Sequence, residues 1–221
     1  MLKKFDWKGG VDKIEFIKTR CKDKKVLDLG CVEHNLYDSH LKDSLWLHSH
    51  IKETATELIG IDNDKKNGRI LNKRGFNIIN GDVERLEKVK EIKGEKFDVI
   101  VVGDLIEHLF NQGMLLDGLK KLCNSNTEII ITTPNCFSSK YVYWYYILGK
   151  EKEVNKEHTC WYSALTLKQL LGFKGFSIEE LHYRSDVRID RNFRTFKFVL
   201  IRKLFPRLCE GLIVVSKCKG I

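Results

Sequence analysis

The sequence predicts an α/β protein with a largely parallel sheet covered by helices on both faces. Short apolar runs alternate with helical stretches from residue 25 to residue 134, as they do in strand–helix–strand units. The run FDVIVVGD (97–104) is mostly apolar, which is typical of a strand buried on both faces. The chain has 221 residues, of which 43% are hydrophobic, and this suits one domain with a sizeable core.

Up to Pro134 the expected elements follow in a regular order. Strands are predicted at 25–30, 57–62, 77–82, 97–104 and 128–134, because each is a short apolar run bounded by turn residues. Helices are predicted at 46–55, 65–75 and 114–123, the last with a clear amphipathic pattern. The strands and helices therefore alternate as a parallel sheet requires.

The pattern changes after Pro134. An aromatic segment, YVYWYY (141–146), and a charged loop come first. A helix at 166–173, a strand at 176–183, a basic amphipathic helix at 192–205 and a closing strand at 212–217 follow. Since no repeat or linker interrupts the chain, we expect residues 1–221 to form one domain with an aromatic, lid-like insertion around residues 137–163.

Composition narrows the class of protein. The formal charge is +9, but lysines are mixed with glutamates as on an ordinary surface, and only residues 184–207 concentrate positive charge with aromatics. Seven scattered cysteines without a CxxC pair favour a reducing compartment over a disulfide framework. No apolar run is long enough to span a bilayer, and MLKKFDWKGG has no apolar segment after its basic residues. These features predict a cytoplasmic protein.

Polar and small residues stand at the end of each predicted strand. Ligands of open parallel sheets bind at the carboxyl ends of the strands, so these positions are candidate binding residues. In chain order they are Asp28, Gly30 and Cys31; Asp62 and Asn63; Gly81, Asp82 and Val83; Gly103, Asp104 and Leu105; and Thr133, Pro134 and Asn135. A carboxylate at Asp62 can accept hydrogen bonds from two ribose hydroxyls, and an acid followed by a backbone N–H, as at Asp82 and Val83, suits an adenine.

Six motifs together resemble one enzyme family. They are VLDLGC, IGID, NGDVE, FDVIVVGDLIEHL, IIITTPN and EHTCWYSALTLKQLLGFKGF. They resemble the class I S-adenosylmethionine-dependent methyltransferases and, within that group, the ubiquinone-biosynthesis O-methyltransferases. The resemblance implies a three-layer Rossmann-like fold whose seven-stranded sheet has the order 3-2-1-4-5-7-6, with an antiparallel last strand. It also implies an enzyme that uses S-adenosyl-L-methionine and releases S-adenosyl-L-homocysteine.

The same resemblance implies a role for each candidate residue. Asp28, Gly30 and Cys31 would lie along the methionine portion of the cofactor, Asp62 and Asn63 at the ribose, Asp82 and Val83 at the adenine, and Gly103, Asp104 and Leu105 behind the sulfonium. His108, with Glu107 beside it, would act on the incoming hydroxyl as general base, since the ordinary pKa of histidine is close to working pH. His158 and Trp161 would lie near the mouth of the substrate site.

The loop after the first strand departs from the family pattern. Val32 and His34 stand where glycines are expected, and Asp28 and Asp62 are 34 positions apart, with the extra residues HNLYDSHLKDSLWLH between them. A separation of about 20 residues is usual for such an acid. We expect residues 46–48 to open the next helix and to supply the support that the glycines give elsewhere. A degenerate, non-catalytic S-adenosylmethionine-binding protein is the alternative.

A metal ion is the second open question at this site. Asp104, Glu107 and His108 could ligate a divalent ion, and some ubiquinone-type methyltransferases hold magnesium at the corresponding acid-x-x-Glu-His. Magnesium prefers an all-oxygen shell, however, so a divalent metal is not expected here.

The methyl acceptor is not fixed by the sequence. We expect a small molecule with a hydroxyl group, either a sugar, a lipid-linked molecule or a quinone-like molecule. A nucleic acid is a weaker alternative, favoured by the charge but not by the GDLIEH motif, which differs from the Asn-Pro-Pro-Tyr type that serves base amines. A nicotinamide dehydrogenase does not fit the glycine loop. The YVYWYY segment is interpreted as a lid, with a homodimer contact or a membrane-surface helix as alternatives.

Overall fold

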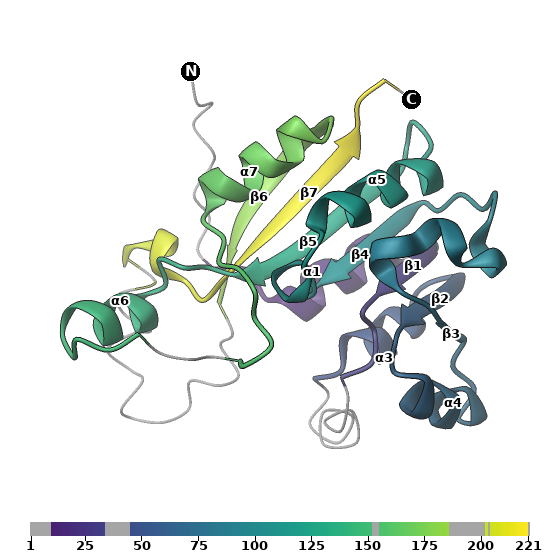
Figure 1. Cartoon of the computed structure of the whole chain (residues 1–221), viewed down its shortest axis with the longest axis horizontal. Coiled ribbons are helices and arrows are strands. Elements are labelled where there is room, and N and C mark those ends of the chain that lie inside the picture. The colour runs from purple at the N-terminus through teal and green to yellow at the C-terminus, as the bar shows by residue number, and fades with distance from the viewer. Residues whose placement is uncertain (1–9, 34–44, 152–154, 186–201, 203, 221) are drawn as a thin grey trace.

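The computed structural model describes residues 10–33, 45–151, 155–185, 202 and 204–220, and contains a seven-stranded sheet of order β3-β2-β1-β4-β5-β7-β6 (Figure 1). The strands are β1 (Lys25–Leu29), β2 (Glu57–Asp62), β3 (Ile78–Asn80), β4 (Val99–Gly103), β5 (Glu128–Pro134), β6 (Phe176–Arg184) and β7 (Gly211–Cys218). β1 to β5 pair in parallel, and β7 lies antiparallel to both β5 and β6. This confirms the fold class and strand order that the sequence predicts.

The α-helices of the described residues are α1 (Lys13–Cys21), α3 (Leu47–Lys52), α4 (Lys65–Lys73), α5 (Gln112–Leu122), α6 (Ser139–Tyr146) and α7 (Ala164–Phe173). Among them, α3, α4, α5 and α7 begin and end close to the predicted positions. Short 3-10 turns cover Val83–Lys88, Lys90–Ile92, Ile106–His108 and Pro206–Leu208. The predicted basic helix at 192–205 lies largely outside the described residues.

Helix α1 is absent from the sequence-based prediction. Its start is marked by Asp12, whose side chain accepts a hydrogen bond from the Glu15 backbone N–H at 3.0 Å. Ile14, Ile17 and Cys21 are its buried residues and pack against the sheet. The third predicted strand, 77–82, is also too long, because Asp82 instead caps the following 3-10 turn through the Glu84 N–H.

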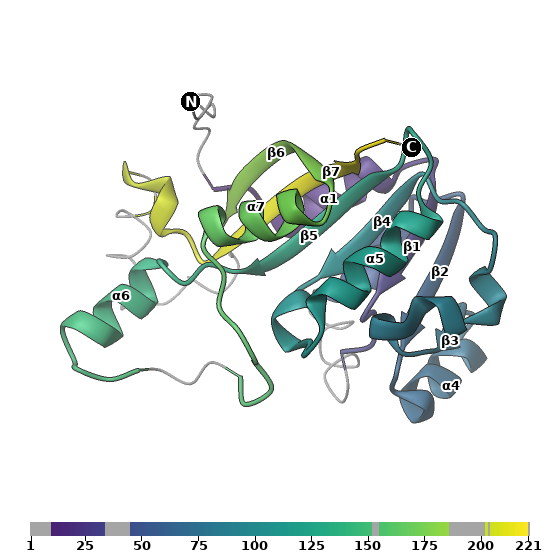
Figure 2. The ribbon, with the colours of Figure 1, turned by 45° about the horizontal axis from the view of Figure 1, so that its top comes forward.

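Alternate residues of the central strands face opposite sides of the sheet. In β4, Ile100 and Val102 pack into the cluster that contains the buried leucines of α5 and α7. Val99 and Val101 pack into a second cluster with α1 and α3. Figures 1 and 2 show α5 and α7 in front of the sheet and α1 behind it. Two packed layers thus hold the carboxyl ends of the parallel strands at one edge.

Within the described part of the chain, no helix combines the length and the apolar composition needed to cross a bilayer.

Candidate functional site

A cleft of about 790 Å³ opens at the carboxyl ends of the parallel strands. Its volume is in the range of small-molecule and cofactor sites. All ten residues predicted to bind a cofactor line it: Asp28, Gly30, Cys31, Asp62, Asn63, Asp82, Val83, Gly103, Asp104 and Leu105. The structure therefore brings together residues as far apart in the sequence as Asp28 and Leu105, which are separated by 77 positions.

The loop after β1 is held by side chains in place of further glycines. Gly30 has a φ of +69°, and a Cβ there would lie 2.8 Å from Leu105 Cδ1, so this one glycine is required. The Val32 backbone N–H donates to Asp62 Oδ2 at 2.8 Å, and the Trp46 indole donates to the Cys31 carbonyl at 2.9 Å. These bonds tie the loop to the end of β2 and to the start of α3.

His48 supports the loop after β1 through a contact with Asp28. Its Nδ1 lies 2.8 Å from Asp28 Oδ2, and both side chains are buried. Trp46 precedes α3 directly, and Leu47 and His48 form its first turn. All three residues line the cleft, as the hypothesis of a rebuilt loop requires.

The acids at the ends of β2 and β3 differ in exposure. Asp62 is buried, and its two oxygens accept from the backbone N–H groups of Val32 and Asp64, both at 2.8 Å. Asp62 therefore ties the loop after β1 to the turn that precedes α4. Asp82 lies at the exposed edge of the cleft, 3.9 Å from the Arg85 side chain.

Asp104 is bound by two cations from distant parts of the chain. It accepts from Arg184 Nη1 at 2.6 and 2.8 Å and from Lys13 Nζ at 2.8 Å. Burial acts to raise the pKa of Asp104, but the charges of Arg184 and Lys13 outweigh it and hold this pKa well below its ordinary value. Its φ of +48° ends β4 in a left-handed conformation. Asp104 thus joins α1 and β6 to the cleft.

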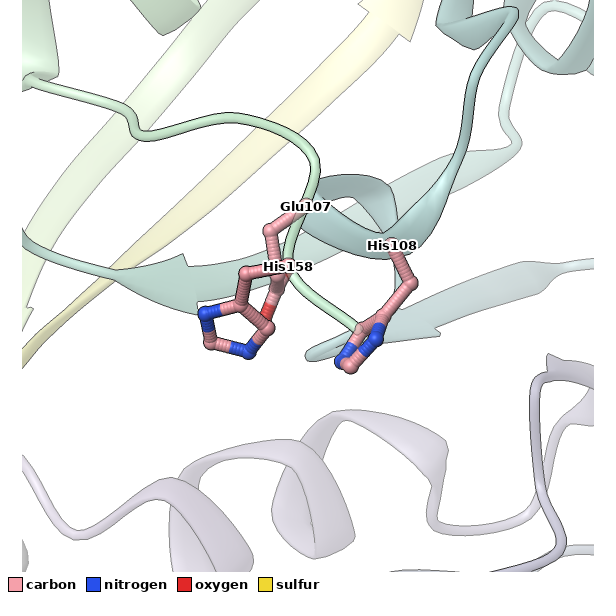
Figure 3. Close-up of side chains that lie close together, drawn as sticks. All are labelled: Glu107, His108 and His158. Atoms are coloured by element: carbon pink, nitrogen blue, oxygen red, sulfur yellow. The ribbon is translucent and has the colours of Figure 1, made fainter. Parts of the chain in front are cut away.

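Glu107 and His108 follow in the next turn and point to different surroundings (Figure 3). His108 lines the cleft, and its Nδ1 lies 4.0 Å from a carboxylate oxygen of Glu157. Glu107 is buried behind it, does not line the cleft, and accepts from Thr133 Oγ1 at 2.9 Å. Burial, followed by the charge of Asp104, raises the pKa of Glu107 to about 8.

His158 and Trp161, the predicted substrate residues, lie beside the cleft but do not line it. The ring centroids of His158 and His108 are 4.7 Å apart, and the rings are nearly perpendicular. Burial, followed by the charge of His108, lowers the pKa of His158. Trp161 packs edge-on against Tyr141 of α6, with centroids 4.8 Å apart.

The metal ligand set suggested by the sequence is not assembled. Asp104 is engaged by Arg184 and Lys13, whereas the trio of ligating groups that the described residues bring together is Glu107, His108 and His158. His158 lies 50 positions beyond His108, so spacing along the chain gave no signal for it.

Comparison with known proteins identifies the family of the chain. A family model described as "Methyltransferase domain" matches residues 9–181, which is more than half of the chain. The chain belongs to this methyltransferase domain family. It is also 25% identical over 163 residues to a Mycolicibacterium smegmatis protein named "Probable S-adenosylmethionine-dependent methyltransferase". That match covers 73% of the chain and 55% of the relative, so the chain spans about half the length of its curated relative.

Solved structures support the fold of the methyltransferase domain. A SAM-dependent methyltransferase from Archaeoglobus fulgidus has a TM-score of 0.55 at 19% identity, covering 93% of this chain and 95% of the other. The magnesium protoporphyrin IX methyltransferase of Synechocystis, solved with S-adenosylhomocysteine, has a TM-score of 0.58 at 14% identity, covering 92% and 80%. The chain therefore carries a Rossmann-like methyltransferase domain.

Several residues of the methyltransferase cleft escaped the sequence-based prediction. Lys13, Glu33, Glu84, Phe110, Asn155 and Glu157 also line it. Lys13 was missed with helix α1, for which the Asp12 cap and the spacing of Ile14, Ile17 and Cys21 were the available signals. The contact between Arg184 and Asp104 could not be predicted from the sequence, because the two residues are 80 positions apart.

Proposed function

We propose that this methyltransferase domain transfers the methyl group of S-adenosylmethionine to a hydroxyl group of a small acceptor. A sugar, a lipid-linked molecule or a quinone-like molecule is the acceptor class that we favour. The observation that carries the proposal is the single cleft lined by all ten cofactor residues and by His108. The further assignment to the ubiquinone-biosynthesis branch rests on the sequence motifs alone.

The nucleoside would lie along the ends of β2 and β3. Asp62 would accept from the ribose hydroxyls, with Asn63 beside it, because both residues line the cleft at the end of β2. Asp82 would accept from the adenine amine, and Val83 would donate its backbone N–H to the ring. Exposure of Asp82 at the edge of the cleft leaves its oxygens accessible for this contact.

The methionine portion would lie over the loop after β1. Gly30 would allow the backbone to approach the cofactor closely. Asp28 and Cys31 lie in the same part of the cleft, bonded to His48 and Trp46 respectively. Gly103, Asp104 and Leu105 would lie behind the sulfonium. The protein thus aligns the methyl carbon between sulfur and acceptor oxygen, and this alignment is the main contribution expected of an enzyme whose cofactor carries the leaving group.

His108 would receive the acceptor's proton. During transfer, the bond from carbon to sulfur breaks and the bond from carbon to oxygen forms, so the hydroxyl proton must leave. His108 is the histidine that lines the cleft at the end of β4, and its imidazole is suited to this task. Glu157, 4.0 Å from Nδ1, would stabilise the resulting imidazolium.

The charge of the cleft argues against a nucleic-acid acceptor. The chain carries +9, yet among the described residues the cleft is lined by seven carboxylate residues and a single lysine: Asp28, Glu33, Asp62, Asp82, Glu84, Asp104 and Glu157, with Lys13. Such a lining attracts the cationic sulfonium and repels the phosphates of a nucleic acid. It is compatible with an uncharged hydroxyl at the reacting position.

A homocysteine-release assay with sugar, lipid-linked and phenolic acceptors tests the proposal. One acceptor class should support turnover, and His108→Ala should slow it about 10²- to 10⁴-fold with cofactor affinity unchanged. Unchanged turnover in that variant would remove His108 from the mechanism. Failure of every hydroxyl acceptor, together with activity on RNA, would replace the proposed acceptor class.

A further inference from the structure

A buried histidine and a buried carboxylate lie together in the wall of the cleft. His48 is in the first turn of α3, and Asp28 is in β1, and both line the cleft. The side chain of His48 is 1% exposed and that of Asp28 is 4% exposed, with His48 Nδ1 lying 2.8 Å from Asp28 Oδ2. Because a carboxylate oxygen accepts, Nδ1 is the donor of this bond.

The other ring nitrogen of His48 indicates that packing alone does not account for this residue. Nε2 is buried and has no hydrogen-bond partner among the described groups. The ring centroid lies 5.5 Å from that of Trp46 and 5.7 Å from that of Phe76, so the surroundings are largely aromatic. An apolar side chain would fill this position without burying an unpaired nitrogen. The bond to Asp28 is therefore the contact that explains a histidine here.

Asp28 faces a charged part of the proposed cofactor. It stands two residues before Gly30, in the segment over which the methionine portion would lie. That portion carries an α-ammonium group, which a carboxylate attracts. The bond from His48 holds Oδ2 and restricts rotation of the carboxylate, so Oδ1 is the oxygen that it leaves for the ammonium group. A side chain that is fixed before binding loses less conformational entropy when the ligand arrives.

We propose that His48 is a positioning residue for the methionine portion of S-adenosylmethionine, and that it acts through Asp28. The inference rests on the proposed function, since it requires that cofactor in this cleft. His48 is the last residue of HNLYDSHLKDSLWLH, the extra residues that separate the first strand from the acid at the end of the second. These residues would thus contribute to the preference for the complete cofactor over a nucleoside that lacks the amino acid.

Two ligands and two substitutions test this role. S-adenosylhomocysteine contains the amino acid, whereas 5′-methylthioadenosine contains the same nucleoside and sulfur without it. His48→Phe retains an aromatic ring but has no donor, and a neighbouring cavity of about 210 Å³, which His48 also lines, has room for the slightly larger ring. His48→Asn loses the ring but retains a donor, because its amide nitrogen occupies the same position along the side chain as Nδ1.

Calorimetry on the full chain measures the affinity of each variant for both ligands. His48→Phe should weaken S-adenosylhomocysteine binding about tenfold or more and change 5′-methylthioadenosine binding less than about twofold, because only the former carries the ammonium group. His48→Asn should keep the affinity for S-adenosylhomocysteine within about threefold of the wild type. His50→Phe is the matched control, since His50 lies in the same helix but does not line the cleft, and both affinities should stay unchanged.

A packing role predicts the opposite order of the two variants. S-adenosylhomocysteine binding that is retained in His48→Phe and lost in a folded His48→Asn would overturn the proposal. Equal losses for both ligands in His48→Phe would also overturn it, because they would indicate general support of the loop. Unfolding curves identify a variant that fails to fold, and the comparison of ligands in the other variant then decides. A wild type that binds neither ligand would instead contradict the proposed function.

Discussion

The floor and the mouth of the cleft are held in different ways. At the floor, Asp28, Trp46, His48 and Asp62 are buried and bond to one another or to the loop after β1. At the predicted mouth, only Ser139 of α6 is buried, and Tyr143, Tyr145 and Tyr146 of this helix are exposed. Both views show α6 standing away from the sheet (Figures 1 and 2).

This difference follows the two tasks of a methyltransferase. The cofactor is the same in every turnover, so its site is best held rigidly by groups whose partners lie inside the protein. The acceptor must enter and leave, and we propose that α6, which lies beside Trp161, contacts it as the predicted lid. We therefore expect changes at the floor to affect stability and cofactor binding, and changes at the mouth to affect the acceptor.

The largest effect is expected from a pair of tryptophans that represents the two regions. Trp46 is completely buried and Trp161 is 39% exposed. Trp46→Ala should lower the free energy of unfolding by about 3–5 kcal/mol, because it opens a cavity and removes the bond to Cys31. Trp161→Ala should cost less than about 1 kcal/mol. Urea unfolding measures both, and equal losses would contradict the distinction between floor and mouth.

A pH titration of stability tests the raised pKa of Glu107, which is buried behind the cleft. Its pKa is about 8 in the folded protein against an ordinary value of 4.5, so the folded state retains a proton that the unfolded state loses. The associated stability is fully present below the ordinary pKa and is lost as the pH rises toward 8. The free energy of unfolding of the wild type should therefore fall relative to that of Glu107→Gln as the pH rises, by at most about 1.4 kcal/mol per pH unit.

This measurement needs a chelator, so that no metal ion binds the carboxylate. If the free energies of unfolding of the two proteins change in parallel between pH 4.5 and about pH 8, Glu107 does not titrate in that range.

The acids at the end of β2 provide the next comparison. Asp62→Ala should weaken S-adenosylhomocysteine binding by about 1–3 kcal/mol, because a charged acceptor of the ribose is lost. Asp64 is the matched control: its side chain caps α4 through the Asn67 N–H and does not line the cleft. Asp64→Ala should cost about 1 kcal/mol of stability with unchanged binding. Calorimetry giving equal affinities for both variants would argue against the ribose assignment.

The smallest effect on stability is expected at the mouth. Tyr146 in α6 is 75% exposed. Tyr146→Ser should change the free energy of unfolding by less than about 0.5 kcal/mol and leave cofactor affinity unchanged. If α6 contacts the acceptor as a lid, the variant should raise the KM for an apolar acceptor. An unchanged KM would leave α6 without a role in acceptor binding.

Sequence reasoning succeeded where local signals were strong. The predicted strands 57–62 and 128–134 match β2 and β5, because each apolar run is bounded by turn residues. The ten residues that line the cleft could be predicted because the ends of parallel strands meet at one edge whatever the details of packing. Helix α1 was missed since its charged sequence carries only three buried residues.

The contacts that determine the chemistry of the cleft could not be predicted in this way. The binding of Asp104 by Lys13 and Arg184 joins residues 91 and 80 positions apart. Likewise, His158 meets Glu107 only because the loop before α7 returns to the end of β4, where the Thr159 N–H donates to the Glu107 carbonyl at 2.8 Å. Side-chain partners of this kind depend on tertiary packing and leave no periodic pattern in the sequence.

The most direct test of the central claim is a crystal structure with S-adenosylhomocysteine bound. The account predicts the ribose hydroxyls on Asp62, the adenine between Asp82 and Val83, and the sulfur facing His108 across the end of β4. Density for the ligand outside the cleft, or with its ribose away from Asp62, would contradict it.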